Sequence, residues 1–149
     1  MKKNIAVLAG GYSGEAEISF KSAATVIKHL PKEKYSTYKI IITDNNWKAD
    51  LDGAFVPVDK NDFTITTTEG KIRFDAVFIA IHGTPGEDGL LQAYFELMGI
   101  PFTTPSSFGS SITFDKWSCN QLLKQLGIKS AEAVLLRKTD RVDIEEILQ

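Results

Sequence analysis

An eight-residue loop, HGTPGEDG at residues 82–89, constrains the fold more than any other feature of the sequence. It directly follows an apolar run at residues 76–81, which is typical of a strand buried on both faces, and a helical pattern begins right after it. Ligands of open parallel sheets bind at the carboxyl ends of strands, where glycine allows close approach and histidine can exchange a proton near neutral pH. The segment therefore predicts either a binding loop around His82 or a simple strand-to-helix turn with Asp88 as the helix N-cap.

Bulk properties are those of an ordinary soluble domain. The 149 residues are enough for one domain, or for one domain and part of a second. A net charge of −2 provides no basic field for nucleic acid, and a single cysteine excludes a disulfide framework or a cysteine metal cluster. The apolar run near the amino terminus is too short for a signal peptide or a membrane span. We expect a cytoplasmic protein with no nucleic-acid or membrane partner.

Strand and helix patterns alternate over the first hundred residues. Apolar runs at residues 5–9, 38–43 and 76–81 predict strands. A helix is expected from near Glu15 to Leu30, with an apolar face formed by Phe20, Ala23, Ile27 and Leu30. Gly99 is expected to end the helix that follows the 82–89 loop. This alternation predicts an α/β fold with a parallel sheet.

Two further segments depart from this alternation. Residues 63–74 alternate apolar and polar side chains around a central glycine, which predicts an antiparallel hairpin inserted at the sheet edge. After a small-residue stretch at 106–111, a helix is expected with Asp115 as its N-cap and Cys119 as a small core residue. A strand at 133–136 and the start of a helix at 142–149 would follow. We therefore expect one domain at residues 1–104 and the truncated beginning of a second at 105–149.

The first strand also ends in a glycine-rich loop, at residues 10–17. Its glycines do not match the G-x-G-x-x-G spacing of dinucleotide-binding sites. Glu15 and Glu17 lie at the expected helix amino terminus, where a pyrophosphate would need positive potential. A carboxylate there either binds an ammonium group or only complements the helix dipole. The residues alone leave both interpretations open.

Two other polar side chains lie near helix ends. Lys116 falls in the first turn of its helix, where a cation is unfavourable by ~0.3–1 kcal/mol. Its side chain either binds an anion such as a phosphate or is simply solvated. His29 lies near the end of the first helix and is expected at the surface.

Three segments together resemble the amino-terminal part of the D-alanine–D-alanine ligases, ATP-grasp enzymes of peptidoglycan synthesis. They are VLAGGYSGEAEIS at residues 7–19, IHGTPGEDGLLQ at 81–92 and FDKW at 114–117, and GIPFT at 99–103 also fits. Their order and spacing span most of the chain. The resemblance implies a Rossmann-like (pre-ATP-grasp) domain with an inserted β-hairpin, followed by the start of the ATP-grasp central domain.

The resemblance also implies roles for four residues. Glu15 resembles the glutamate that holds the ammonium group of the first D-alanine, and Ser13 shares its loop and helps to hold it. His82 resembles the histidine that orients or deprotonates near the substrate carboxylates. Lys116 resembles a lysine that reaches the ATP phosphates. ATP would phosphorylate the first D-alanine, the second D-alanine would attack the acyl phosphate, and Mg²⁺ would neutralise phosphate charge.

Several expectations follow for the whole protein. Most ATP and Mg²⁺ ligands of such ligases would lie beyond Gln149, so this chain alone is expected to be inactive. The family implies a cytoplasmic homodimer joined through the first domain, with a role in cell wall biogenesis and cell shape. Two alternatives are another ATP-grasp ligase, such as a D-alanine–D-lactate ligase, and a non-catalytic α/β binding module.

Overall fold

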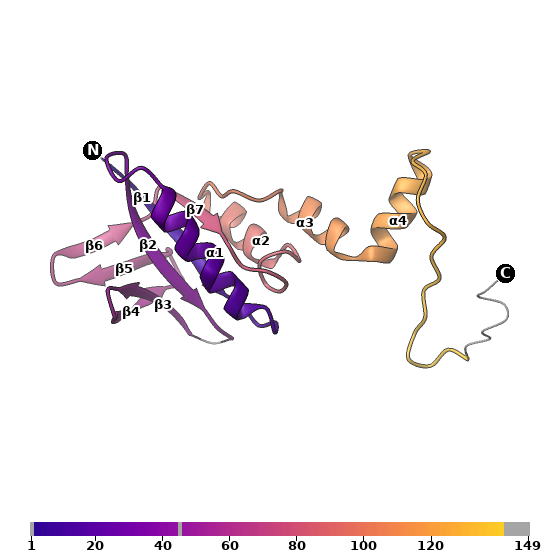
Figure 1. Cartoon of the computed structure of the whole chain (residues 1–149), viewed down its shortest axis with the longest axis horizontal. Coiled ribbons are helices and arrows are strands. Elements are labelled where there is room, and N and C mark those ends of the chain that lie inside the picture. Colours follow the sequence, from indigo (N-terminus) through magenta and orange to yellow (C-terminus); the bar gives the residue numbers. More distant parts are fainter. Residues whose placement is uncertain (1, 45, 142–149) are drawn as a thin grey trace.

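The computed structural model describes residues 2–44 and 46–141, which form a seven-stranded sheet with helices on both faces (Figure 1). The order of the strands across the sheet is β6-β5-β4-β3-β2-β1-β7. The elements are β1 (Lys3–Gly10), α1 (Ala16–His29), β2 (Tyr35–Ile42), β3 (Trp47–Leu51), β4 (Ala54–Asp59), β5 (Thr64–Thr67), β6 (Gly70–Arg73), β7 (Ala76–Ile79), α2 (Leu90–Met98), α3 (Ser107–Phe114) and α4 (Lys116–Gln125).

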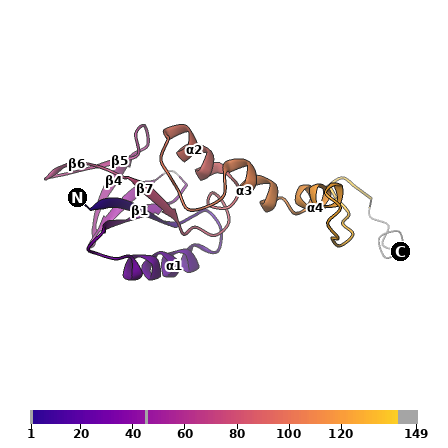
Figure 2. The ribbon, with the colours of Figure 1, turned by 90° about the horizontal axis from the view of Figure 1, so that it is seen from above.

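The predicted parallel strands form one end of this sheet. β1 pairs in parallel with both β2 and β7. Figure 2 shows α1 and α2 on opposite faces of the sheet. Side chains of β1 alternate between the two resulting cores: Ala6 and Leu8 pack on the α2 side, whereas Val7 and Ala9 pack on the α1 side. β1 is therefore buried on both faces, as its continuous apolar run predicts.

The inserted hairpin is confirmed, but the insertion is larger than predicted. β5 and β6 form the hairpin expected at residues 63–74. They are preceded by β3 and β4, which continue from β2 in antiparallel pairing and carry the sheet outward. Both strands are short and mix apolar with charged side chains, and β4 contains Pro57, so their sequences carry only a weak strand pattern.

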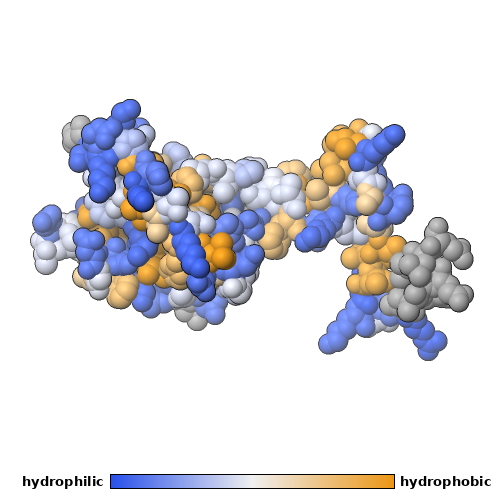
Figure 3. Space-filling view, in the orientation of Figure 1, coloured by the Kyte–Doolittle hydropathy of each residue, from blue (hydrophilic) through white to orange (hydrophobic). Residues whose placement is uncertain are grey.

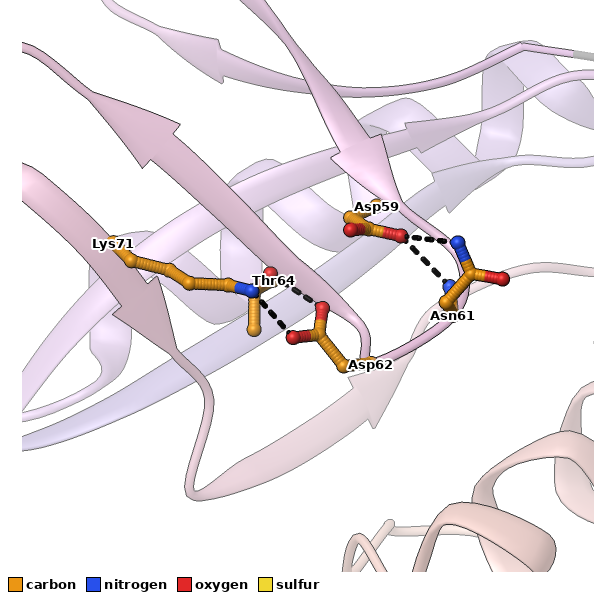
Figure 4. A network of polar contacts seen from close by, with 5 residues as sticks. All are labelled: Asp59, Asn61, Asp62, Thr64 and Lys71. Carbon is orange, nitrogen blue, oxygen red and sulfur yellow. Dashed lines mark hydrogen bonds and ion pairs between the residues drawn. The ribbon is translucent and has the colours of Figure 1, made fainter.

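A polar network holds the loop between β4 and β5 (Figure 4). Asp62 pairs with Lys71 of β6 at 2.5 Å and accepts from Thr64 at 2.6 Å, and these two contacts, that with Lys71 above all, lower the pKa of the Asp62 carboxyl. Asp59 accepts from the backbone and side-chain nitrogens of Asn61, each at 2.9 Å. The network ties the loop to the hairpin that follows it.

Aromatic side chains pack the insertion against α2. Phe63 is fully buried and lies 4.8 Å from Phe95 and 5.3 Å from Phe74 between ring centroids. Trp47 and Tyr94 complete the cluster. Burial raises the pKa of Tyr94 to about 12, so its hydroxyl stays protonated and donates to the Lys60 carbonyl at 2.6 Å. The insertion is thus part of the core on the α2 side of the sheet.

The apolar face of α1 differs from the expected one. Phe20 is 37% exposed, and Ser19 is the residue that turns fully inward. The Ser19 hydroxyl donates to the Ala80 carbonyl at 2.8 Å and accepts from the Gly10 amide at 2.9 Å. These two hydrogen bonds set the rotation of α1 and exclude Phe20 from the core, which the apolar spacing alone could not reveal. Ala23, Ile27 and Leu30 pack on the sheet as predicted, and His29 is exposed as expected.

The N-cap of α2 is Gly89, so the prediction of Asp88 is wrong by one residue. Gly89 has a φ of +93°, and a Cβ there would lie 2.5 Å from the Ser111 hydroxyl oxygen and 2.6 Å from the Ser107 carbonyl oxygen. Both the backbone angle and the close approach of α3 therefore require glycine. Asp88 still contributes to the turn, because its Oδ1 accepts from the Leu90 amide at 3.2 Å. Gly99 ends α2 as predicted, with a φ of +66°.

The small-residue stretch folds into α3, a helix the sequence pattern did not predict. Glu96 of α2 accepts from the amide and the hydroxyl of Ser107, at 2.9 and 2.5 Å. Both hydrogen bonds hold the pKa of Glu96 below its ordinary value, and the bond from the Ser107 hydroxyl has the larger effect. Ser111 donates to the Asp88 carbonyl at 2.7 Å. α3 is thereby attached both to α2 and to the end of the 82–89 loop.

α4 begins where the sequence predicts, but the segment after it lacks the predicted strand. Asp115 is the N-cap and accepts from the Ser118 amide at 2.7 Å. Cys119 is only half-buried, so its expected place in a core is wrong. Residues 133–136 form no strand, because no described strand lies beside them to pair with; Val134, Leu135 and Leu136 are exposed. The helix expected at 142–149 lies outside the described residues.

α4 extends away from the sheet, and apolar side chains lie on the surface of this part of the chain (Figures 1 and 3). Phe108 of α3 is 73% exposed, and Leu126 and Ile128, just after α4, are 65% and 50% exposed.

We expect Phe63→Ala to lower the free energy of unfolding by about 3–5 kcal/mol, because it removes a fully buried aromatic ring from the cluster. Urea unfolding of the purified chain measures this loss. Phe55→Ala is the matched control: Phe55 is 55% exposed, and the Lys48 ammonium group lies 4.1 Å from its ring centroid, so the variant should cost no more than about 1 kcal/mol. Equal losses for the two variants would contradict the packing described.

We expect the stabilisation by Glu96 to depend on pH. Its pKa is lower in the folded than in the unfolded chain, so its contribution is fully present above the unfolded pKa and is lost as pH falls through the folded pKa. The melting temperature of Glu96→Gln should therefore lie below that of the wild type at pH 7, and the difference should shrink on acidification. A difference that is constant down to pH 2 would contradict this.

Candidate functional site

Two loops meet at the carboxyl ends of the adjacent parallel strands β1 and β7. The Ser13 hydroxyl, from the first loop, donates to the His82 carbonyl at 3.0 Å and accepts from the Glu15 amide at 3.2 Å. The Tyr12 amide donates to the Thr84 carbonyl at 3.0 Å. The structure therefore brings Ser13, Glu15 and His82 together, although 67 positions of sequence separate Glu15 from His82.

Gly83 gives the two loops room to approach each other. A Cβ at this position would lie 3.0 Å from the Ser13 hydroxyl oxygen and 3.5 Å from Glu15 Oε2. Its φ of +71° also favours glycine. The Gly83 amide donates to Glu87 Oε2 at 2.8 Å, so the loop is closed by one of its own carboxylates. Sequence reasoning did not assign this role to Glu87.

The first turn of α1 presents the Glu15 carboxylate. Glu15 is the N-cap of α1 and is exposed, and its side chain makes no capping hydrogen bond with the helix. A negative charge at a helix amino terminus interacts favourably with the helix dipole. Because the carboxylate does not cap the helix, its oxygens remain available to a ligand that carries positive charge.

His82 is held from both sides. Its carbonyl accepts from Ser13, and its Nε2 lies 3.1 Å from the hydroxyl oxygen of Ser22, which comes from α1. The imidazole is half-buried, and His82 lines an open groove of about 570 Å³ between α1 and the end of β7. Ile18, Phe78, Glu87 and Thr104 also line this groove. Sequence reasoning missed Ser22, whose only signal is its spacing of three residues from Ser19 on the same helical face.

A buried glutamine supports the loop from below. Gln92 of α2 is fully buried, and its Nε2 donates to the Gly86 carbonyl at 2.6 Å and to the Thr104 hydroxyl at 3.0 Å. A Cβ at Gly86 would lie 2.5 Å from the Ile81 carbonyl oxygen. The loop therefore packs directly on the end of its own strand, which makes it a rigid support for His82.

Lys116 does not join these residues. It is the first residue of α4, is exposed, and lies on the part of the chain that extends away from the sheet (Figure 1). Over residues 2–44 and 46–141, no three His, Cys, Asp or Glu side chains gather in a way that could hold a metal ion. No helix in the same part of the chain is long and apolar enough to cross a membrane.

A family model described as the D-ala D-ala ligase N-terminus matches residues 4–105. The chain belongs to this family. The match contains both loops of the candidate site, so the resemblance of segments 7–19 and 81–92 is confirmed at the level of the family.

Relatives with curated names agree with this assignment. The chain is 44% identical to a D-alanine–D-alanine ligase from Bacteroides thetaiotaomicron over 150 aligned residues, and 46% identical to one from Flavobacterium johnsoniae over 148. These alignments cover 100% and 99% of this chain but 46% of each relative. The chain therefore spans less than half the length of these relatives.

Solved structures share the fold. The D-alanine–D-alanine ligase from Coxiella burnetii matches with a TM-score of 0.87 and 26% identity, over 99% of this chain and 48% of that one. A D-Ala:D-Ser ligase from Enterococcus faecalis matches with a TM-score of 0.77 and 29% identity, over 89% and 44%. The ligase from Bacillus anthracis, solved with ATP, matches with a TM-score of 0.75 and 26% identity, over 99% and 42%.

Proposed function

We propose that this chain forms the first-substrate side of an ATP-dependent ligase that joins two D-alanines for peptidoglycan synthesis. The observation that carries the proposal is the gathering of Ser13, Glu15 and His82 where β1 and β7 end. The names of the relatives support the reaction. Cytoplasmic location and a role in cell shape are the parts of this proposal that rest on the family alone.

Glu15 and His82 each suit one part of an amino acid, and Ser13 connects the loops that carry them. The Glu15 carboxylate is an acceptor for the ammonium group of the first D-alanine, and such a charge-assisted hydrogen bond contributes about 1.5–3 kcal/mol. His82 comes from the adjoining loop and would orient the substrate carboxylate or hold a proton there. Ser13 links the main chains of the two loops and would keep them at a constant separation. Together they would position the carboxylate that must be activated.

The nucleotide belongs to a different part of the protein. ATP would supply the phosphoryl group that activates the first D-alanine carboxylate, with Mg²⁺ neutralising phosphate charge. Of the residues described, Lys116 is the one we assign to the phosphates, because it is an exposed cation at the start of α4. We place this lysine in the beginning of the ATP-grasp domain, which we propose to start near residue 105.

The identity of the second substrate is a separate question. The D-Ala:D-Ser ligase shares the fold of this chain, so the fold supports a D-alanine–D-alanine ligase and a ligase for another second substrate, such as D-lactate, equally well. The ligase names of relatives at 44% and 46% identity favour D-alanine and argue against a non-catalytic binding module.

We expect Glu15→Gln, made in the longer ligase because this chain alone is expected to be inactive, to raise the KM for the first D-alanine at least ~10-fold, equivalent to about 1.4 kcal/mol. The KM for ATP should hardly change. Glu17→Gln is the matched control, since Glu17 lies in the same helical turn but pairs with Lys21 at 2.7 Å on the surface. Steady-state kinetics with each substrate varied measures both constants.

The alternative for Glu15 makes a different prediction. If its carboxylate only complements the helix dipole, the variant should lose a few tenths of a kcal/mol of stability and keep normal D-alanine kinetics. Melting temperatures of both variants, measured beside the kinetics, separate the two roles.

We also propose that the protein is a homodimer joined through this domain. α2 leaves Leu90 and Leu97 exposed, at 61% and 86%, on the side of the helix away from its buried residues Leu91 and Phe95. Light scattering of the longer ligase should give twice the mass of one chain, and Leu97→Glu should reduce it to that of one chain. A wild-type protein that is monomeric at high concentration would overturn this.

A further inference from the structure

We propose that Ser22 is a positioning residue: it holds the imidazole of His82 through Nε2, so that Nδ1 is the nitrogen that faces the substrate. The inference rests on the proposed function, because it assumes that His82 acts on the first D-alanine. It goes beyond that function by naming the group that fixes the ring and the ring atom that acts.

The position of Ser22 follows from the register between α1 and the end of β7. Ser19 and Ser22 are three residues apart on one helical face. Ala80 and His82 are two residues apart on an extended segment, so they point to the same side. The Ser19 hydroxyl donates to the Ala80 carbonyl at 2.8 Å. One step further along both elements, Ser22 therefore lies opposite His82, with 3.1 Å between Oγ and Nε2.

The backbone and the ring of His82 are held by different residues. Ser13 binds the carbonyl and therefore fixes the main chain, but it leaves the side chain free to rotate. Within residues 2–44 and 46–141, the Ser22 hydroxyl is the hydrogen-bond partner that the structure gives to the ring, and it gives Nδ1 none. The contact with Ser22 is thus what selects one ring orientation beside the groove.

This contact has a chemical consequence. A neutral imidazole carries one proton, so one ring nitrogen donates while the other accepts, and the partner of one nitrogen determines the state of the other. A hydroxyl that occupies Nε2 leaves Nδ1 to donate to a substrate carboxylate or to accept a proton from the substrate. Without the hydroxyl, the ring would sample other rotamers and both tautomers.

Two variants of the longer ligase separate this role from simple packing. Ser22→Ala removes the hydroxyl at a half-buried helical position where alanine is a good helix former, so the fold should be kept. Ser22→Thr retains the hydroxyl and serves as the matched control. Imidazole ¹⁵N spectra of the ligase labelled in histidine report the ring directly. His82 is assigned by its loss in His82→Gln, and His29 is the internal reference.

We expect Ser22→Ala to move the His82 Nε2 and Nδ1 resonances toward those of a free imidazole, to leave His29 unchanged, and to lower kcat/KM for the first D-alanine by about 3- to 10-fold, with the KM for ATP unchanged. Ser22→Thr should restore both readouts. Unchanged His82 resonances would overturn the inference, as would changed resonances with normal D-alanine kinetics, or a kinetic loss that Ser22→Thr does not restore.

The same experiment tests the proposed function separately. If His82→Gln itself leaves the D-alanine kinetics normal, His82 has no role with this substrate, and both the proposed role and the inference fail. If His82→Gln impairs the reaction while Ser22→Ala has no effect on either readout, the proposed function stands and only the inference is overturned.

Discussion

Parallel pairing of β1 with β7 places the carboxyl ends of two strands side by side, and the contacts of the candidate site depend on this pairing. The loops that leave the strands start from a common edge, so a single hydroxyl, that of Ser13, can bridge them. α1 strengthens the same junction, because Ser19 binds the Gly10 amide and the Ala80 carbonyl. The hydrogen bonds of Ser13 and Ser19 therefore fix the two loops and α1 relative to the paired strands.

The glycines of the 82–89 loop make this arrangement possible. Gly83 admits Ser13 and Glu15, and Gly86 lets the loop fold back on its own strand. Gly89 allows α3 to approach the start of α2, where a Cβ would collide with Ser111. Each glycine lies where a side chain would push two elements apart. The loop is thus tightly packed against both its own strand and the loop that carries Ser13.

Sequence patterns predicted the elements whose signal is local. A run such as residues 5–9 is apolar throughout because β1 is buried on both faces, and Asp115 caps α4 through its own side chain. Ser13, Glu15 and His82 could be proposed together because motifs in two separate loops identified the family. The pairing of Ser22 with His82 depends on how α1 is rotated, and no local pattern records that.

Other features depended on tertiary contacts and were missed or wrong. β3 and β4 are short strands that persist by pairing with β2 and with each other, and α3 is a small-residue helix stabilised by Glu96. Phe20 fits an apolar helical face, but Ser19 takes the inward position because it satisfies two backbone groups. Residues 133–136 have the composition of a strand, but no described strand lies beside them to pair with. Composition alone cannot reveal whether such a neighbour exists.

We propose that the two bridged loops form the site of the first D-alanine. A crystal structure of the longer ligase with D-alanine and a non-hydrolysable ATP analogue tests this most directly. We expect the ammonium group to lie within hydrogen-bonding distance of the Glu15 carboxylate, with the substrate carboxylate beside His82 Nδ1. A D-alanine bound away from both loops, in a complex where Ser13 still bridges them, would contradict it.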